Sequence, residues 1–186
     1  LFATRWLKAD VIEAIKADTT ISDAVRTKAL EIARHWSVNA NHLNERSWSI
    51  VKQPGRTVDE YQLAVRYMEA ACELAPDDGN LLNTLGVAQY RAGEFTHAVR
   101  TLSQSDALNI PVQGGSHPAD LTFLAMAHHQ LGHADEAAEL LKKLRQLLIT
   151  DRWKGDSDSQ AFLKEVEELV SSSTEAPAEV AQPTQP

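Results

Sequence analysis

Histidines gather in one part of this chain, and imidazole is the side chain there best suited to bind a metal. Four of the seven fall close together: His117, His128, His129 and His133. The last two are four residues apart, a spacing that can place both imidazoles on one face of a helix. Gly132 ends the helix between them, however, and neither an intervening Glu nor a third ligand is present. A metal-dependent hydrolase using the His117–His133 cluster is therefore a remote alternative to surface or groove histidines.

Other catalytic patterns are absent from the sequence. It has no Gly-x-Ser-x-Gly elbow, no glycine-rich nucleotide loop, and no His-Arg-Asp or Asp-Phe-Gly motif of a protein kinase. The single cysteine, Cys72, cannot form an internal disulfide and is interpreted as a small core residue. Asp77-Asp78-Gly79 is interpreted as a turn rather than a calcium loop. We therefore predict that the chain is not an enzyme and has no metal site and no cofactor.

The charge balance argues against two classes of partner. The chain has 186 residues and a formal net charge of −8, with 18 basic and 26 acidic side chains. Nucleic-acid binding depends on a surplus of Lys and Arg, so neither nucleic acid nor an anionic membrane is an expected partner. No apolar run approaches the roughly 18–20 residues that cross a membrane, so we expect no membrane insertion.

The start of the sequence and its cysteine content indicate the cellular compartment. Residues 1–6 lack the charged and then apolar pattern of a secretory signal, and they begin without an initiator Met. The single cysteine fits a reducing compartment. We expect a cytoplasmic segment of a longer protein.

The elements that would position functional side chains repeat every 39 residues. Leu82-Asn83-Thr84-Leu85-Gly86 recurs as Leu121-Thr122-Phe123-Leu124-Ala125, and a degenerate copy begins at Leu43-Asn44. A fixed period of this length is typical of stacked supersecondary units. Gly93 and Gly132 follow the two later copies, where a residue with positive φ ends a helix at low cost.

A second helix follows each copy. Four of its residues, mostly apolar, are spaced by three, four and three positions, which is one face of an α-helix. They are Tyr61, Ala64, Met68 and Ala71; Phe95, Ala98, Leu102 and Ser105; and Ala134, Ala137, Leu141 and Leu144. Thr57-Val58-Asp59-Glu60 predicts a capping box at the start of the first of these helices. Gly86 and Ala125 lie where two helices of a hairpin approach closely.

The order Leu, Leu-Gly, Gly, aromatic, Ala resembles the tetratricopeptide repeat (TPR), a 34-residue helix–turn–helix unit. The resemblance covers 79–109 and 118–148, and partly 40–76, with extra loop residues lengthening two of the turns. Arg46 and Gln89 depart from the usual pattern. The resemblance implies an all-α fold: a TPR-type right-handed α-solenoid of antiparallel helix pairs.

A narrower similarity extends over roughly 25–170. The residues that carry it include Ala29-Leu30-Glu31-Ile32-Ala33, Asn44-Glu45-Arg46-Ser47-Trp48, Ser105-Asp106-Ala107-Leu108 and Leu124-Ala125-Met126-Ala127-His128-His129. This part of the sequence is similar to the C-terminal TPR regions of large bacterial proteins that carry a serine/threonine protein kinase domain or WD-repeat blades. This resemblance implies a non-catalytic appendage.

Apolar stripes also predict helices on both sides of the repeats. Leu7, Val11 and Ile15 mark one helix, Ser22 is the expected N-cap of the next, and Phe162 opens the stripe of a helix from about 158 to 170. The predicted organisation is an N-terminal helix pair at 1–37, three TPR-like helix hairpins at 38–150, a C-terminal capping helix at 151–170 and a disordered tail at 171–186.

The TPR resemblance also implies a binding surface, because the first helix of each TPR hairpin lines a concave groove. The residues expected there are Asn44, Trp48, Val51, Lys52, Asn83, Val87, Tyr90, Arg91, Thr122, Met126, His129 and Gln130. They combine an apolar floor, an Asn pair and two cations. We therefore expect a ligand with an apolar anchor and an Asp, Glu or phosphate group. The carboxylate clamp of some TPR proteins is missing.

These features favour a protein–protein interaction module that binds an extended peptide or partner segment in the groove. Two alternatives stay open. The stack could be an intramolecular structural or regulatory spacer that packs on a kinase or WD-repeat domain of its own parent protein. Trp48 could lean into the first hairpin, filling space near Arg46, instead of facing the groove.

Overall fold

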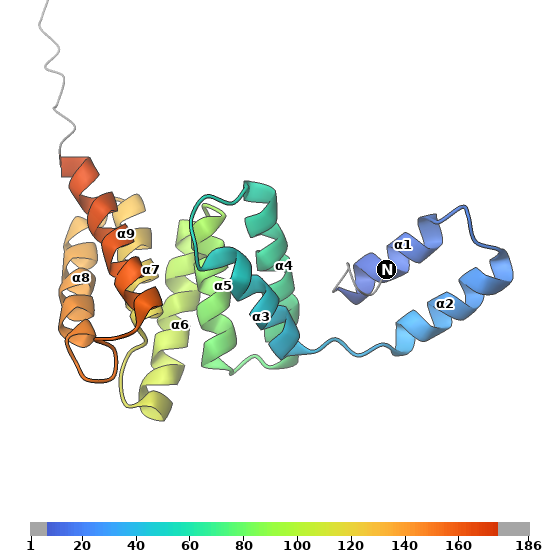
Figure 1. Cartoon of the computed structure of the whole chain (residues 1–186), viewed down its shortest axis with the longest axis horizontal. Coiled ribbons are helices and arrows are strands. Elements are labelled where there is room, and N and C mark those ends of the chain that lie inside the picture. Colours follow the sequence, from blue (N-terminus) through green and yellow to red (C-terminus); the bar gives the residue numbers. More distant parts are fainter. Residues whose placement is uncertain (1–6, 175–186) are drawn as a thin grey trace, which may run out of the picture.

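The computed structural model describes residues 7–174, and this part of the chain contains nine α-helices and no strand (Figure 1). The predicted all-α class is thereby confirmed. The helices are α1 Lys8–Ala17, α2 Asp23–His35, α3 Ala40–Val51, α4 Val58–Leu74, α5 Gly79–Arg91, α6 Phe95–Gln113, α7 Pro118–Gln130, α8 Ala134–Leu148 and α9 Ser157–Thr174. None of these helices is long and apolar enough to span a bilayer.

Helices α3 to α8 form a row in which each helix packs against the next (Figure 1). Helix α5 also packs against both α3 and α7, whereas α4, α6 and α8 do not contact one another. Helices that touch on one side of a row and separate on the other give it an inner and an outer face. The inner face is therefore made by α3, α5 and α7.

One hydrophobic core runs through this row and includes fully buried Met68, Leu102 and Phe123. The N-terminal pair, α1 and α2, has a small core of its own, made by Val11, Ile15 and Ala33. Figure 1 shows an extended segment joining this pair to the row, and an ion pair between Asp10 of α1 and Arg66 of α4, at 2.5 Å, also links the two. The row, and not the N-terminal pair, therefore holds most of the buried apolar surface.

Local sequence signals set several helix ends as predicted. Thr57 and Glu60 form the expected capping box of α4, because each side chain accepts a hydrogen bond from the backbone N–H of the other residue. Ser22 caps α2 by accepting from the N–H of Val25. Gly93 and Gly132 adopt φ values of 84° and 78° just after α5 and α7, where other residue types would be strained.

The C-terminal boundary differs slightly from the sequence prediction. Helix α9 continues to Thr174, four residues beyond the predicted end at 170, so residues 171–174 are helical. Residues 171–174 are Ser-Ser-Ser-Thr, so this last turn carries no apolar residue that could mark it in the sequence. The rest of the predicted tail, 175–186, lies outside the described residues, as do residues 1–6 of the predicted N-terminal pair.

Gly86→Leu is expected to lower the free energy of unfolding by about 1–3 kcal/mol through overpacking. A Cβ atom at Gly86 would lie 2.4 Å from Cγ of Leu102, which confirms the expected close approach of α5 and α6. Urea unfolding measures the effect. Gly155→Leu is the matched control, because a Cβ there meets nothing within 4 Å. Equal stability of the two variants would contradict this helix contact.

Candidate functional site

Helix α9, the last helix of the described part of the chain, packs on the inner face of the row. Helices α5 and α7 each pack extensively against the helix that precedes them, but α9 makes few contacts with α8 and packs mainly on α7. Figure 1 shows α9 running obliquely across this end of the row. Helix α9 therefore does not continue the row and instead lies on the inner face. Helix α9 contacts a surface formed by α3, α5 and α7, and this surface is called the groove below.

Aromatic side chains join α9 to the groove. The Phe162 ring of α9 is only 3% exposed, and its centroid lies 5.9 Å from Trp48 of α3 and 5.3 Å from Phe123 of α7, both in edge-to-face geometry. Such pairs contribute about 0.5–1.5 kcal/mol each beyond their buried area. Val166, one turn further along α9, is fully buried. Phe162 thus connects three helices that are distant in sequence.

Arg91 is the charged centre of this contact. Its side chain is 5% exposed, and its guanidinium binds the carboxylate of Glu165 on α9 with both terminal nitrogens, Nη2 lying 2.8 Å from Oε2. Nε donates to the carbonyl oxygen of Val51 at 2.9 Å, and the cation lies 4.9 Å from the Phe123 ring centroid. A guanidinium buried this deeply needs a partner of opposite charge. Glu165 supplies it.

Two further ion pairs flank the buried one and are more exposed. Lys52 lies 3.6 Å from Asp158 at the start of α9, and Arg145 of α8 donates to Glu167 at 2.9 Å. Exposed pairs of this kind contribute about 0–1 kcal/mol each. They orient α9, whereas the aromatic cluster and Arg91 hold it.

The structure places the predicted groove residues at three depths. The buried ones are Val51, Asn83, Val87, Thr122 and Met126. The partly buried ones are Asn44, Trp48, Lys52, Tyr90, Arg91 and His129, and Gln130 is exposed. Four of the residues expected to face a ligand have no exposed surface, because the inner helices pack directly on one another: Val51, Val87, Thr122 and Met126. Trp48 and Arg91, by contrast, meet α9 directly.

A polar pocket of about 260 Å³ lies beside Trp48. It is lined by Asn44, Trp48, Asn80, Asn83, Thr84 and His117. The Oδ1 atom of Asn44 is buried and has no hydrogen-bond partner among residues 7–174. The predicted Asn pair therefore lines a pocket, but the sequence pattern missed Asn80, Thr84 and His117, because they precede or follow the repeated positions.

A buried carboxyl group lies under the inner face. Asp120 is fully buried, and its Oδ1 accepts from Nδ2 of Asn83 at 2.8 Å. Burial raises its pKa to about 6, the Asn83 hydrogen bond and nearby Ser105 lower it in part, and Asp106 raises it further. The Ser105 hydroxyl donates to Gly79 instead, and Oδ2 of Asp120 has no partner within the described range. This carboxyl titrates well above an exposed aspartate.

The candidate pair from the sequence is His129 and His133. In the structure His128 lies close to His133, with 3.2 Å between the two Nδ1 atoms. Burial and the nearby His133 lower the pKa of His128. His117 is elsewhere, with its ring 5.0 Å from the Trp153 ring. Among residues 7–174 no group of three or more possible ligands comes together.

We expect purified, untagged protein to contain no stoichiometric zinc. Two imidazoles without a third ligand fall short of the three or four protein ligands that zinc sites use. Elemental analysis after dialysis measures the metal content. One equivalent of zinc that is retained in the wild type and lost in His128→Ala would contradict this expectation.

Cys72 is the one thiol of the chain. It is partly buried, and burial, followed by Asp78 and Glu69, raises its pKa to about 11. A thiol with this pKa is protonated at neutral pH and is a poor nucleophile. This fits its interpretation as a packing residue.

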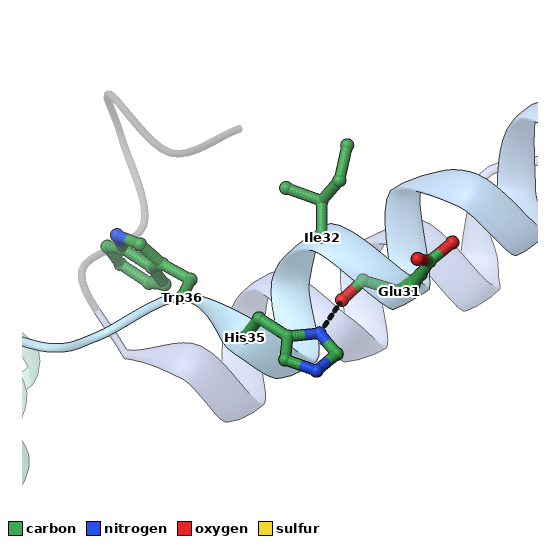
Figure 2. A pocket seen from close by; sticks show the side chains of 4 residues that line it. All are labelled: Glu31, Ile32, His35 and Trp36. Atoms are coloured by element: carbon green, nitrogen blue, oxygen red, sulfur yellow. Dashed lines mark hydrogen bonds between the residues drawn. The ribbon is translucent and has the colours of Figure 1, made fainter.

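The N-terminal pair carries a shallow depression at the end of α2, lined by Glu31, Ile32, His35 and Trp36. Figure 2 shows these side chains spread in different directions, not converging on one point. The His35 ring is bonded to the carbonyl oxygen of Glu31 at 2.8 Å. The depression lacks the convergent polar groups of a ligand site.

No family model matches the sequence, and no curated protein is similar to it. The function of the chain is therefore inferred from the groove and from α9.

Proposed function

We propose that this chain is a TPR-type right-handed α-solenoid that acts as a non-catalytic protein-interaction scaffold, with the groove as its binding surface. The 39-residue period, the succession of helix hairpins and the contacts along the inner face support the TPR assignment. The partner is a protein or peptide segment, and nucleic acid is not expected because of the acidic balance of the chain.

One observation carries this proposal: the groove already binds a protein segment, namely α9. The sequence favours a ligand with an apolar anchor and an acidic group, and α9 presents Phe162 to Trp48 and Glu165 to Arg91. Aromatic and Arg residues commonly dominate the energy of protein interfaces. The chemistry of the groove therefore suits a protein ligand.

We further propose, on the narrower resemblance alone, that the module is a cytoplasmic appendage of a larger bacterial protein with a kinase or WD-repeat domain. The occupied groove also favours a second candidate. If α9 never leaves, the chain is a rigid spacer whose outer surface packs on its own parent protein. The buried Arg91–Glu165 pair supports this alternative, because separating it exposes an unpaired charge.

Affinity capture with quantitative mass spectrometry tests the groove against the spacer. The Trp48→Ala, Arg91→Ala double variant is expected to lose specific partners of the wild-type chain, because both side chains line the groove. Lys142→Ala, on the exposed surface of α8 and away from α9 contacts, is the matched control and is expected to retain them. Circular dichroism must show wild-type helicity for each variant. Equal capture by all three proteins would favour the spacer.

A further inference from the structure

The occupant of the groove indicates which kind of partner the groove takes. We infer that the groove is a receptor for an amphipathic helix with the pattern Asp-x-x-x-Phe-x-x-Glu-Val, and that a partner helix of this kind binds in place of α9. This inference rests on the proposed function and adds the class of partner to it. In α9 the four positions are Asp158, Phe162, Glu165 and Val166.

These positions share one face of a helix. Residues at i, i+3 and i+4 lie together on an α-helix, whereas in an extended chain residues at i and i+3 point to opposite sides. Phe162, Glu165 and Val166 have this helical spacing, and Asp158 lies one turn earlier. An extended peptide therefore cannot present the side chains of Phe162, Glu165 and Val166 to the groove together. The partner segment is helical, which refines the extended ligand expected from the sequence.

Phe162 and Glu165 each meet a specific feature of the groove. Phe162 contacts the Trp48 and Phe123 rings, and Glu165 pairs with both terminal nitrogens of Arg91. Because a guanidinium presents its donors in a fixed fork, a bidentate pair selects a carboxylate at one position and orientation. The buried Arg91 thus fixes the register of the bound helix.

Helix α9 is placed so that it can be exchanged. It is the last described helix, it packs little against α8, and the eight residues 149–156 connect the two. Its removal leaves the contacts among α3 to α8 in place, but takes the Phe162 ring away from Phe123 and the counterion away from Arg91. A partner helix with the same face restores both contacts. One without the Glu leaves the cation unpaired.

The covalent link favours α9 over any free helix. A short linker gives a tethered ligand an effective concentration in the millimolar range, so a free peptide competes poorly with intact α9. Substitution of the α9 residues that contact the groove weakens this competition without changing the groove. Intact and weakened chains should therefore differ strongly in their affinity for the same added helix.

A fluorescent synthetic peptide of residues 156–174 tests this inference by fluorescence anisotropy. The Phe162→Ala, Glu165→Ala chain is expected to bind it at least about tenfold more tightly than the wild-type chain does. Glu168→Ala, on exposed α9 surface, is the matched control and should behave as wild type. Adding Arg91→Ala to the weakened chain, or Glu165→Ala to the peptide, should reduce binding at least about tenfold.

A second experiment avoids substitutions that could weaken folding. A protease site inserted after Gly155, where the surroundings are open, allows the link to α9 to be cut in an otherwise wild-type chain. The cut chain is expected to exchange its α9 for the labelled peptide. Failure of the peptide to bind in both arms, or binding that is independent of Arg91, overturns the inference.

The two proposals fail in different ways. If the peptide does not bind but cellular partners still depend on Trp48 and Arg91, the proposed function stands and the helix receptor is wrong. If the peptide binds as expected but no cellular partner depends on these residues, the receptor stands and the proposed function fails.

Discussion

Glu165→Ala is expected to lower the free energy of unfolding by about 3 kcal/mol, because it leaves a buried guanidinium without its counterion. The Arg91 side chain is 5% exposed, and the variant retains only its bonds to the Val51 carbonyl and the Phe123 ring. Neither of these neutralises the charge. Equilibrium unfolding in urea measures the loss, and detachment of α9 alone would appear as a separate early transition.

The matched control for this prediction is Glu167→Ala, in the same helix. Glu167 pairs with Arg145 in an exposed position, so its removal should cost no more than about 1 kcal/mol. The Arg91→Ala, Glu165→Ala double variant should lose less than the sum of the two single variants, because it leaves no unpaired charge. Similar losses for Glu165→Ala and Glu167→Ala would mean that Arg91 is solvated in solution.

Asp120→Asn is expected to stabilise the protein at about pH 7 by up to about 3 kcal/mol, because ionising this buried carboxyl opposes folding at that pH. The raised pKa of about 6 arises chiefly from burial. Because the folded state holds the proton more tightly than the unfolded state, Asp120 favours folding most below about pH 4. That contribution is lost as the pH rises from about 4 through 6. The variant should lack this part of the pH dependence.

Urea unfolding at about pH 4.5 and 7 measures this difference, provided that both proteins remain folded at the lower pH. Asp77→Asn, in an exposed turn, is the control for removing one acidic group. The stability difference between Asp120→Asn and the wild type should grow with pH, whereas the difference for Asp77→Asn should stay small. A constant difference for Asp120→Asn would contradict the raised pKa.

Much of the local structure could be predicted because its causes are local. The Thr57–Glu60 capping box and the positive φ of Gly93 and Gly132 depend on residues within one turn of each other. The predicted contact at Gly86 needed only the repeat pattern, which aligns a glycine with the helix that follows. The predicted ligand chemistry, an apolar anchor and an acid, also came from the types of side chain that the inner helices present.

What covers the inner face could not be predicted in the same way. Helical periodicity and local hydrogen bonding are enough to predict most of the helices, the Ser22 and Thr57 caps and the apolar face of α9. A periodic stripe defines a buried face but not its partner. Phe162 and Val166 would suit a helix that extends the row as well as one that crosses it. The choice depends on long-range contacts, because Arg91 and Glu165 are 74 residues apart and meet only when the row is assembled.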